Sequence, residues 1–346
     1  MSVAINGTNG ITYNDGSLQA SAPVGKNRII NGNMMIDQRN TTQTGNGYSV
    51  DRWAIYDNTS ATYTFAQDSS APTGFINSLK FTTTGTDTSI GSTEQCVIYH
   101  QIEGNNIADL NWGTANAKTI TLSFYVRSSL TGTFAGSLGN NGYARSYPFT
   151  YTISSADTWE QKTITITGDT TGTWLTTNGV GISLRLAIAA GSSFEATAGA
   201  WASGNYFSVS GATNVVGTAS STFYITGVQL EVGDTATDFE NLQYTTQLQL
   251  CQRYYYATSS AFIAATATTL CYNLQFPVTM RTTPTETHSY VGVANDVYNI
   301  ITAATPTFVP NGNFPINTGM KFAYDFDAGL TAGQPYQTDF TFSAEL

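Results

Sequence analysis

The sequence predicts an all-β protein whose largest part is an antiparallel β-sandwich of the jelly-roll type. Only 10% of the 346 residues are charged, so Gly, Ser, Thr and Asn must form most of the polar surface. Aromatic residues make up 12% of the chain, with 20 Tyr and 18 Phe. Aromatic and β-branched side chains lose rotamer freedom in helices and pack well on pleated sheets. Segments of alternating polarity, separated by turn signals, recur along most of the chain.

Residues 1–25 are predicted to be a short N-terminal attachment segment made of hairpin strands. Asn-Gly occurs at residues 6–7 and 9–10, and Asp-Gly at residues 15–16. These dipeptides supply the positive φ angles of tight hairpin turns. Strands this short cannot bury a core alone. We therefore expect the segment to dock on a partner surface, and a frayed terminus is the alternative.

Residues 26–237 are predicted to form the jelly roll, because apolar and polar residues alternate in several of their segments. Such alternation buries one face of a strand and leaves the other in solvent, as in an antiparallel sandwich. A region of about 200 residues with many such strands favours a jelly roll. The alternating segments are residues 62–66, 119–126, 162–167, 182–186 and 223–230.

One connecting helix is predicted over residues 238–256. Leu242, Leu248, Cys251 and Tyr255 recur at approximately helical spacing, with Gln-rich positions between them. That spacing is typical of a helix with one apolar stripe. The helix is expected to separate the jelly roll from a final domain.

A small C-terminal β domain is predicted over residues 257–346. Polarity alternates at residues 270–276 and again at 320–326. Pro277 and Pro284 flank a stretch that we expect to be an edge strand or a loop, because proline cannot donate a ladder hydrogen bond.

Charge and cysteine content argue against several classes of protein. A net charge of -10 would repel phosphates, so no nucleic acid is expected as a partner. No apolar run reaches the roughly 18 residues of a membrane span, and the N-terminus does not resemble a signal peptide. Cys96, Cys251 and Cys271 lack metal-site spacing and indicate buried reduced thiols. A charge-poor β protein made in a reducing compartment fits a product released by lysis.

Several short motifs occur one after another in a fixed order. They are G-I-T-Y-N-D-G-S-L-Q at residues 10–19, N-R-I-I-N-G-N-M at 27–34, Q-R at 38–39, Y-S-V-D-R-W at 48–53, Q-L-E-V-G at 229–233, F-E at 239–240, L-C-Q-R-Y-Y at 250–255 and F-P-V-T-M-R-T-T-P at 276–284. In this order they resemble tail-fibre and minor tail proteins of tailed bacteriophages with a carbohydrate-binding-module-like jelly roll. The resemblance covers about residues 1–285 and leaves 286–346 unassigned, as a receptor-binding tip or an oligomerisation cap.

The resemblance implies a homotrimeric virion fibre protein that binds a host-surface glycan receptor. Residues 1–25 would attach it to a tail or capsid protein. The chain would be made in the host bacterial cytoplasm, released by lysis and located in the virion. The motif residues so marked are Arg52, Trp53, Gln229, Glu231, Cys251, Gln252, Arg253 and Tyr254.

Elementary chemistry assigns structural roles to these motif residues. A single buried Trp is usually a packing residue, so Trp53 is expected in the core. Arg52 is then expected to pair with a carboxylate, with Asp51 and Glu231 as candidates. Three consecutive tyrosines at 254–256 cannot all face inward, so at least one is expected at the surface or at a subunit interface.

Sugar binding uses aromatic faces and short polar side chains, which the loops of this chain supply. The stretch N-N-G-Y-A-R-S-Y at residues 140–147 combines two rings, an arginine and amides at a turn. The predicted ligand-binding residues are Tyr143, Arg145, Tyr147, Trp112 and Trp174, with Trp159 and Trp201 as further candidates. Each of these could instead belong to the core. An alternative receptor surface is the set Tyr290, Tyr298, Phe308, Phe314, Tyr324 and Tyr336 in the C-terminal domain.

Catalysis is not expected, although a glycan depolymerase tailspike is the alternative from another class. Glycan cleavage needs two carboxylates about 5–10 Å apart. The sequence-close pairs are Asp157 with Glu160 and Asp325 with Asp327, which are typical of turns and caps. No cofactor is expected, and a structural Ca²⁺ is compatible with a jelly roll. A capsid fibre or decoration protein and a freestanding carbohydrate-binding module also stay open.

Overall fold

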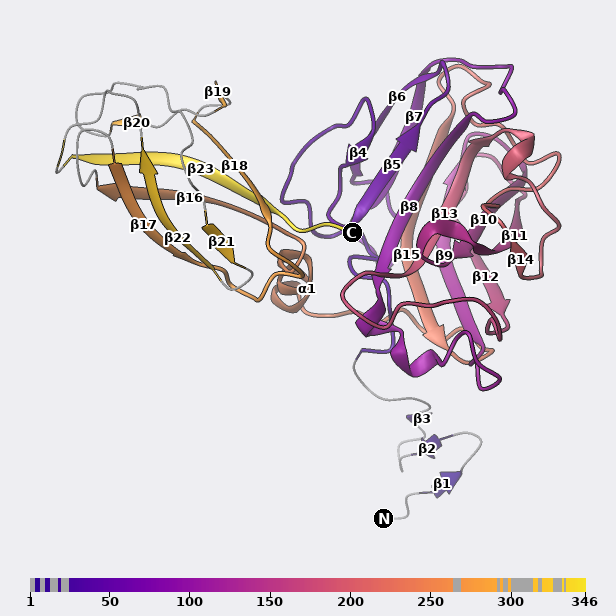
Figure 1. The fold of residues 1–346 in the computed structure, drawn as a ribbon. Helices are drawn as coiled ribbons and strands as arrows, with labels where there is room; N and C mark the ends of the chain where they lie inside the picture. Colours follow the sequence, from indigo (N-terminus) through magenta and orange to yellow (C-terminus); the bar gives the residue numbers. More distant parts are fainter. Residues whose placement is uncertain are drawn as a thin grey trace. The chain divides into compact units, whose positions relative to one another are not determined.

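The computed structural model describes the backbone of residues 4–6, 10–12, 18–19, 25–263, 269–290, 293–294, 298–299, 314–316, 319–325, 332 and 334–346. The chain forms two compact units. The first holds residues 1–35, 42–48 and 53–242, and the second holds residues 36–41, 49–52 and 243–346. Figure 1 shows that strands dominate both units, as predicted. No helix in the described part of the chain is long and apolar enough to span a membrane.

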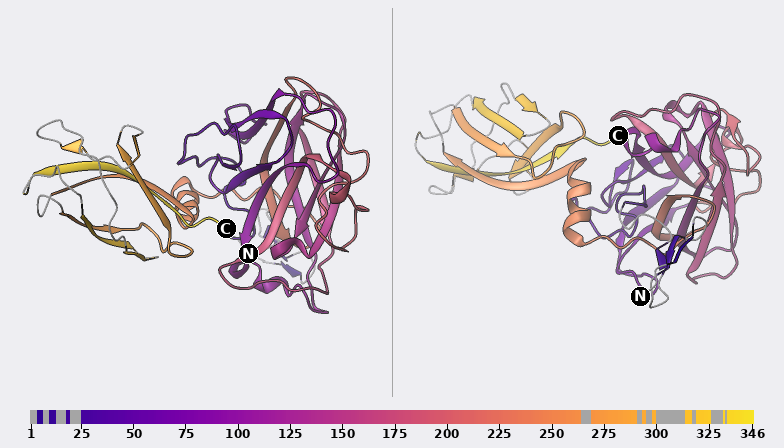
Figure 2. Two further views of the ribbon diagram at one scale, coloured as in Figure 1. Left: turned by 45° about the horizontal axis from the view of Figure 1, so that its top comes forward. Right: turned by 90° about the horizontal axis from the view of Figure 1, so that it is seen from below.

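Two antiparallel sheets make up most of the first unit, which we call the jelly-roll unit. The larger sheet has the spatial order β14 (Ala202–Ser203), β11 (Arg145–Ile153), β10 (Gly132–Gly139), β13 (Val180–Ala190), β8 (Gln95–Glu103), β5 (Trp53–Asp57) and β4 (Gly47–Tyr48). The smaller has the order β12 (Glu160–Ile166), β9 (Ile120–Ser128), β15 (Thr222–Val232), β7 (Ser78–Gly85) and β6 (Thr62–Asp68). Figure 2 shows the two sheets face to face.

The strand order confirms the predicted jelly roll. β13 lies between β10 and β8, and β15 lies between β9 and β7, so the chain crosses repeatedly from one sheet to the other. All five alternating segments predicted for this region fall on β6, β9, β12, β13 and β15, with small differences at their ends.

The core lies between the two sheets. On β13, Leu184 and Leu186 are 1% exposed, and the antiparallel register places them opposite His100 and Ile98 of β8. Burying a large apolar side chain of this kind stabilises the fold by roughly 1.5–3 kcal/mol. Aromatic side chains that are no more than 1% exposed fill much of the remaining space: Trp53, Phe65, Phe81, Phe124, Phe134 and Phe223.

The outer face of the larger sheet is also covered near its centre, by residues 191–216. Every second residue of β13 points to this face, and yet all of residues 181–189 are buried. The cover is an apolar cluster of Val97, Ala135, Ala187 and Phe207, against which Phe194 and Val209 pack. This covering segment also forms one wall of a surface hollow.

The second unit contains two further antiparallel sheets and the helix α1 (Tyr244–Gln252). One sheet has the order β16 (Tyr255–Ile263), β23 (Pro335–Ser343), β18 (Thr285–Tyr290) and β19 (Val293–Ala294), and β20 (Tyr298–Asn299) also pairs with β23. The other has the order β17 (Thr269–Gln275), β22 (Gly319–Asp325) and β21 (Phe314–Ile316). The alternating segments 270–276 and 320–326 correspond to β17 and β22, and residues 277–284 form a loop.

The helix is shorter than the predicted 238–256. The Glu240 carboxylate accepts hydrogen bonds from the backbone N–H groups of Gly25 (2.6 Å) and Asn27 (2.9 Å), which holds this stretch extended. At the other end, Tyr255 already belongs to β16. The helix buries Gln247 and Cys251, whereas Leu248 is only half-buried.

The boundaries of the two units also differ from the predicted domain boundaries. Residues 36–41 and 49–52 belong to the second unit, although the sequence places them inside the jelly roll. In the N-terminal segment, β1 (Ala4–Asn6), β2 (Gly10–Thr12) and β3 (Leu18–Gln19) form an antiparallel sheet. Its predicted docking on a partner stays a prediction.

Candidate functional site

Trp53 is a core residue, as predicted. It is fully buried, its indole N–H donates to the Asn31 carbonyl (3.0 Å), and its ring lies 5.0 Å from that of His100. Gly32, in the motif at residues 27–34, approaches β15 so closely that an added Cβ would lie 2.1 Å from the Val228 carbonyl oxygen. Only glycine fits at that position.

Gln229 and Glu231 form a buried hydrogen-bond network with the segment after β15. The Gln229 amide donates to the Glu231 carboxylate (2.8 Å) and its oxygen accepts from the backbone N–H of Glu240 (2.8 Å). The Glu231 carboxylate also accepts from the backbone N–H (2.9 Å) and hydroxyl (2.7 Å) of Thr237. We call Gln229, Glu231, Thr237 and Glu240 the Gln229 network.

The predicted carboxylate partners of Arg52 are wrong. Arg52, which is 1% exposed, pairs with the Glu345 carboxylate and stacks on the ring of Tyr254, 3.6 Å from its centroid. Glu231 belongs to the Gln229 network, and Asp51 pairs with Arg39 (3.1 Å). No local spacing could indicate Glu345, because 293 residues separate it from Arg52.

Arg39 and Arg52 share Glu345, and together with Asp51 and Tyr254 they form what we call the Arg52 network. Arg39 pairs with Glu345 at 2.9 Å and with Asp51 at 3.1 Å. Burial raises the pKa of Asp51 to about 6, in spite of the opposing charge of Arg39. All five residues lie in the second unit.

The remaining motif residues also have structural surroundings. Cys251 is fully buried, and burial raises the pKa of its thiol well above the ordinary value, so it is a core thiol. Arg253 donates to the Thr279 carbonyl (3.1 Å), and Gln252 is half-buried. Of the three tyrosines, Tyr254 is fully buried, whereas the next two are only half-buried.

Three of the five predicted ligand residues belong to one aromatic cluster. The rings of Trp112 and Trp174 lie 4.7 Å apart, and Trp201 lies 5.3 Å from each of them and from Tyr147. Trp112, Trp174 and Tyr147 are only 6%, 8% and 6% exposed, so their rings contact one another and offer little surface to a ligand. The remaining candidate ring, Trp159, packs edge-on against Tyr224.

The other two predicted residues, Tyr143 and Arg145, lie at the surface on either side of the start of β11. The half-buried ring of Tyr143 lies 4.2 Å from the guanidinium of Arg185. Arg185 is not among the residues predicted from the sequence, although it stands at an outward position of the alternating strand β13. It donates to Ser137 Oγ, to the Tyr206 carbonyl and to Asn205, and burial lowers its pKa to about 10.

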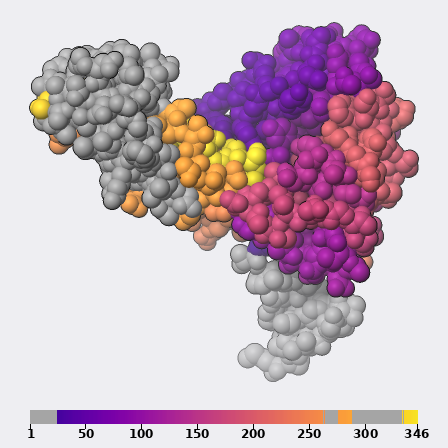
Figure 3. Space-filling view, viewed as in Figure 1, coloured from indigo at the N-terminus to yellow at the C-terminus, as the bar shows by residue number. Residues whose placement is uncertain are grey.

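Arg145 lines a surface cavity of about 300 Å³, which we call the Arg145 hollow. Its lining residues are Asn140, Asn141, Ala144, Arg145, Gly172, Thr173 and Leu175. Four of the seven come from the stretch that the sequence singled out as most ligand-like. Figure 3 shows the surface of this part of the jelly-roll unit in magenta and pink.

The polar groups of the Arg145 hollow are held in place by an ion pair and by hydrogen bonds to neighbouring segments. Arg145 pairs with the buried Asp169 through two bonds (2.7 and 2.8 Å), and its third nitrogen donates to Ser203 Oγ (3.1 Å). Gly172 adopts φ +79°, and an added Cβ would lie 2.6 Å from the Arg145 side chain. The amide of Asn140 donates to the Thr173 carbonyl (3.0 Å), which ties the two loops together.

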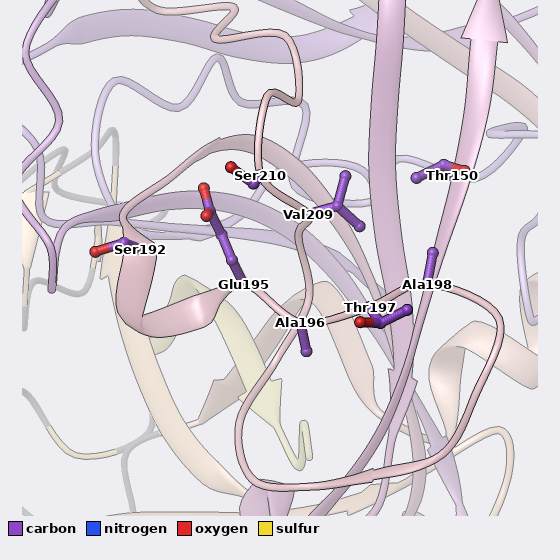
Figure 4. Close-up of a pocket in the computed structure, with 8 residues that line it drawn as sticks. All are labelled: Thr150, Ser192, Glu195, Ala196, Thr197, Ala198, Val209 and Ser210. Atoms are coloured by element: carbon purple, nitrogen blue, oxygen red, sulfur yellow. The ribbon is translucent and has the colours of Figure 1, made fainter.

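A second cavity, of about 680 Å³, lies beside the covering segment, and we call it the Glu195 hollow. Its lining residues are Thr150, Ser192, Glu195, Ala196, Thr197, Ala198, Val209 and Ser210. Figure 4 shows these side chains around it, with Thr150 on β11 across from Glu195. No sequence pattern indicates this cavity, because its described lining apart from Glu195 consists of small residues and Val209 and contains no aromatic side chain.

The predicted acidic pair Asp157 and Glu160 has structural surroundings. Glu160 accepts from the backbone N–H groups of Ser154 and Ser155, and its bond with Lys162 lowers its pKa. Asp157 pairs with Arg127 at 3.5 Å. Side chains 325 and 327 lie outside the described residues, as do those of the C-terminal candidates other than Tyr336, which is fully buried.

Metal ligands do not gather in the described part of the chain. No three His, Cys, Asp or Glu side chains there are placed to hold a metal ion together. The structural Ca²⁺ that the fold allows therefore stays a prediction without assigned ligands.

No protein-family model and no curated protein matches the chain. Solved structures that match include the enzymatically active domain of tailspike protein 4 of Bacteriophage CBA120 (11% identity, 60% of this chain, 22% of that chain, TM-score 0.33). Another is the family 11 carbohydrate-binding module of cellulase Lic26A-Cel5E of Clostridium thermocellum (12% identity, 56% of this chain, 95% of that chain, TM-score 0.29). A third is TmCBM61 in complex with β-1,4-galactotriose (9% identity, 54% of this chain, 91% of that chain, TM-score 0.28). All three scores are low, so the fold assignment rests on the strand order of this chain.

Proposed function

We propose that this chain is a structural fibre protein of a tailed bacteriophage whose jelly-roll unit binds a glycan on the host surface. The observation that carries the binding part is the Arg145 hollow. There, Asn141 and Thr173 are exposed, and the arginine between them is fixed by Asp169. Fixed polar groups on the loops of a rigid scaffold suit the hydroxyl groups of a sugar.

The virion part of the proposal rests on the motif order of the sequence. In this proposal the chain is a homotrimer, residues 1–25 attach it to the particle, and adsorption needs no catalysis. Three copies of a weak glycan site would add avidity, so that contacts of low affinity sum to firm attachment. The surroundings of Glu160 argue against this residue as a general acid, because a general acid needs a raised pKa and that of Glu160 is lowered.

A glycan array printed with bacterial lipopolysaccharides, capsules and teichoic acids tests the binding part. We expect the full chain to bind a subset of these glycans and Asn141→Ala to bind them about fivefold more weakly. Asn116→Ala, at an exposed asparagine outside both hollows, is the matched control and should bind like the wild type. Equal binding by both variants would place the site elsewhere. An absence of binding by the wild type would overturn the binding part.

Light scattering tests the fibre part independently. We expect a native mass near three times the 37.0 kDa of the chain. A monomer would contradict the trimer without affecting the result of the array. Release of reducing ends from a bound polysaccharide would contradict the non-catalytic role and favour a depolymerase.

A further inference from the structure

The Glu195 hollow has a carboxylate with no hydrogen-bond or ion-pair partner in the part of the chain that the structure describes. Among the residues that the structure describes, none donates a hydrogen bond to the Glu195 side chain, and none forms an ion pair with it. The residue is only half-buried, so its oxygens stay accessible from the cavity. A carboxylate in this state accepts hydrogen bonds through both oxygens. The hollow therefore offers acceptors to a ligand that brings donors.

The rest of the lining is uncharged. Hydroxyl groups come from Thr150, Ser192, Thr197 and Ser210, and apolar surface comes from Ala196, Ala198 and Val209. None of the described residues that line the cavity is a Lys or an Arg. Glu195 thus gives the hollow a negative potential that no lining residue offsets, and an anionic ligand would meet repulsion there.

The walls of the Glu195 hollow are formed before any ligand arrives. The Ala196 N–H donates to the Ser208 carbonyl (3.0 Å), and the Gly199 N–H donates to the Pro148 carbonyl (2.8 Å) on β11. Below them the rings of Phe194 and Phe207 pack 5.1 Å apart within the apolar cluster that covers β13. A ligand would therefore bind without ordering these loops, which lowers the entropic cost of binding.

We propose that the Glu195 hollow is a second saccharide-binding site, specific for sugar units without negative charge and preferring units that carry a free amine. Glu195 would accept hydrogen bonds from the ammonium or hydroxyl groups of the sugar. The threonine and serine hydroxyls would bind further hydroxyls, and Val209 would contact the apolar face of the ring. Hydrogen bonds between ionised partners are about twice as strong as neutral ones, which gives the amine its advantage.

The two hollows then differ in charge. In the Arg145 hollow the guanidinium group is already paired with Asp169, whereas the Glu195 hollow contains a carboxylate without a counter-ion among its lining residues. The inference rests on the proposed function in one respect, that the chain binds glycans. It differs from the proposed function in the residues involved and in the class of sugar that they select.

Chemical-shift mapping of the isotope-labelled full chain separates the two sites in one spectrum. The probes are a chitosan tetramer, which carries amines, its fully N-acetylated form, which is neutral, and tetragalacturonate, which is acidic. We expect the amides of residues 192–198 and 209–210 to shift most with chitosan, less with the neutral tetramer and not with tetragalacturonate. In Glu195→Gln, the affinity for chitosan at these amides should fall about tenfold, while that for the neutral tetramer changes little.

Asn141→Ala is the matched variant in the other hollow and should leave all shifts at residues 192–198 unchanged. The inference is overturned if no probe shifts the amides around Glu195, if tetragalacturonate shifts them as strongly as chitosan does, or if Glu195→Gln keeps the preference for the amine. Shifts at residues 140–145 and 172–175 report on the Arg145 hollow in the same spectra. The failure of one site is thereby distinguished from the failure of the other.

Discussion

The Arg52 network and the Glu195 hollow each contain a glutamate carboxylate, and the two carboxylates are in opposite conditions. In the Arg52 network, Glu345 bridges two arginines and is 7% exposed. In the Glu195 hollow, a carboxylate of the same length is half-buried and has no partner among the described residues. A side chain whose hydrogen bonds are all made inside the protein stabilises the fold. A side chain with unused acceptors or donors at a cavity is available to a ligand.

A sequence motif can mark residues that stabilise the fold or residues that bind a ligand, and this difference indicates which kind the motifs of this chain are. Arg52, Gln229, Glu231 and Tyr254 belong to the motifs at residues 48–53, 229–233 and 250–255, and all four are buried. These segments therefore encode how the two units fold. The residues that line the hollows lie outside the motifs, and apart from Arg145 and Thr150 on β11 they lie on connecting segments, where sequence can vary without loss of the core.

Glu345→Gln gives the largest expected effect and tests the interior side of this comparison. Loss of the carboxylate removes Glu345 as the ion-pair partner of the buried Arg52 and as one of two partners of the half-buried Arg39, and breaking a buried pair costs about 3–5 kcal/mol of unfolding free energy. The matched control is Asp109→Asn. The Asp109 side chain is 48% exposed, and its carboxylate lies 2.7 Å from the guanidinium of Arg28. That substitution should cost less than about 1 kcal/mol. Urea unfolding followed by circular dichroism measures the unfolding free energy of both variants. Equal losses would contradict the distinction between the buried and the exposed carboxylate.

The pH dependence of stability tests the same network through Asp51. Its folded-state pKa of about 6 lies above the ordinary value of 3.8, so the folded state holds the proton more tightly than the unfolded state does. The contribution of Asp51 to stability is therefore complete below pH 3.8 and is lost as the pH rises to about 6, a decrease of about 3 kcal/mol. Asp51→Asn should lack this decrease. Unfolding curves of both proteins between pH 4 and 7 measure the difference, and parallel profiles would contradict the prediction.

Gly172→Ala has a smaller effect and acts on the support of a hollow. At φ +79° a residue other than glycine is strained, and the new methyl carbon would lie 2.6 Å from the Arg145 side chain. We expect a loss of about 1–3 kcal/mol in unfolding free energy. Glycan binding at the Arg145 hollow should weaken as well, because Arg145 must move. Gly142→Ala, at φ +72° with no neighbour within 4 Å, is the control that carries the strain without the collision.

The sequence indicated the fold more fully than the sites, for reasons visible at particular residues. Alternation predicted β6, β9 and β13, because a strand with one buried face repeats every two residues. Helical spacing placed α1 but not its ends, since Glu240 holds the preceding residues extended through bonds to residues 25 and 27. The roles of Glu345 and Arg185 arise from contacts between distant segments, which local spacing does not show. The small residues around Glu195 form no sequence pattern that indicates a binding site. Aromatic residues near loops pointed to Trp112 and Trp174, which contact each other and expose little surface to solvent.

Asn141→Ala has the smallest expected effect on stability and tests the surface side of the comparison. The side chain is exposed and bonded to no other described residue, so its loss should change the unfolding free energy by less than about 0.5 kcal/mol. Adjacent Asn140 is 3% exposed and holds the loop through Thr173 and the Arg145 N–H, so Asn140→Ala should cost about 1–3 kcal/mol. Two neighbouring asparagines would thus separate binding from folding. If Asn141→Ala destabilised the unit as much as Asn140→Ala, the Arg145 hollow would be a structural joint between loops and not a place for a sugar.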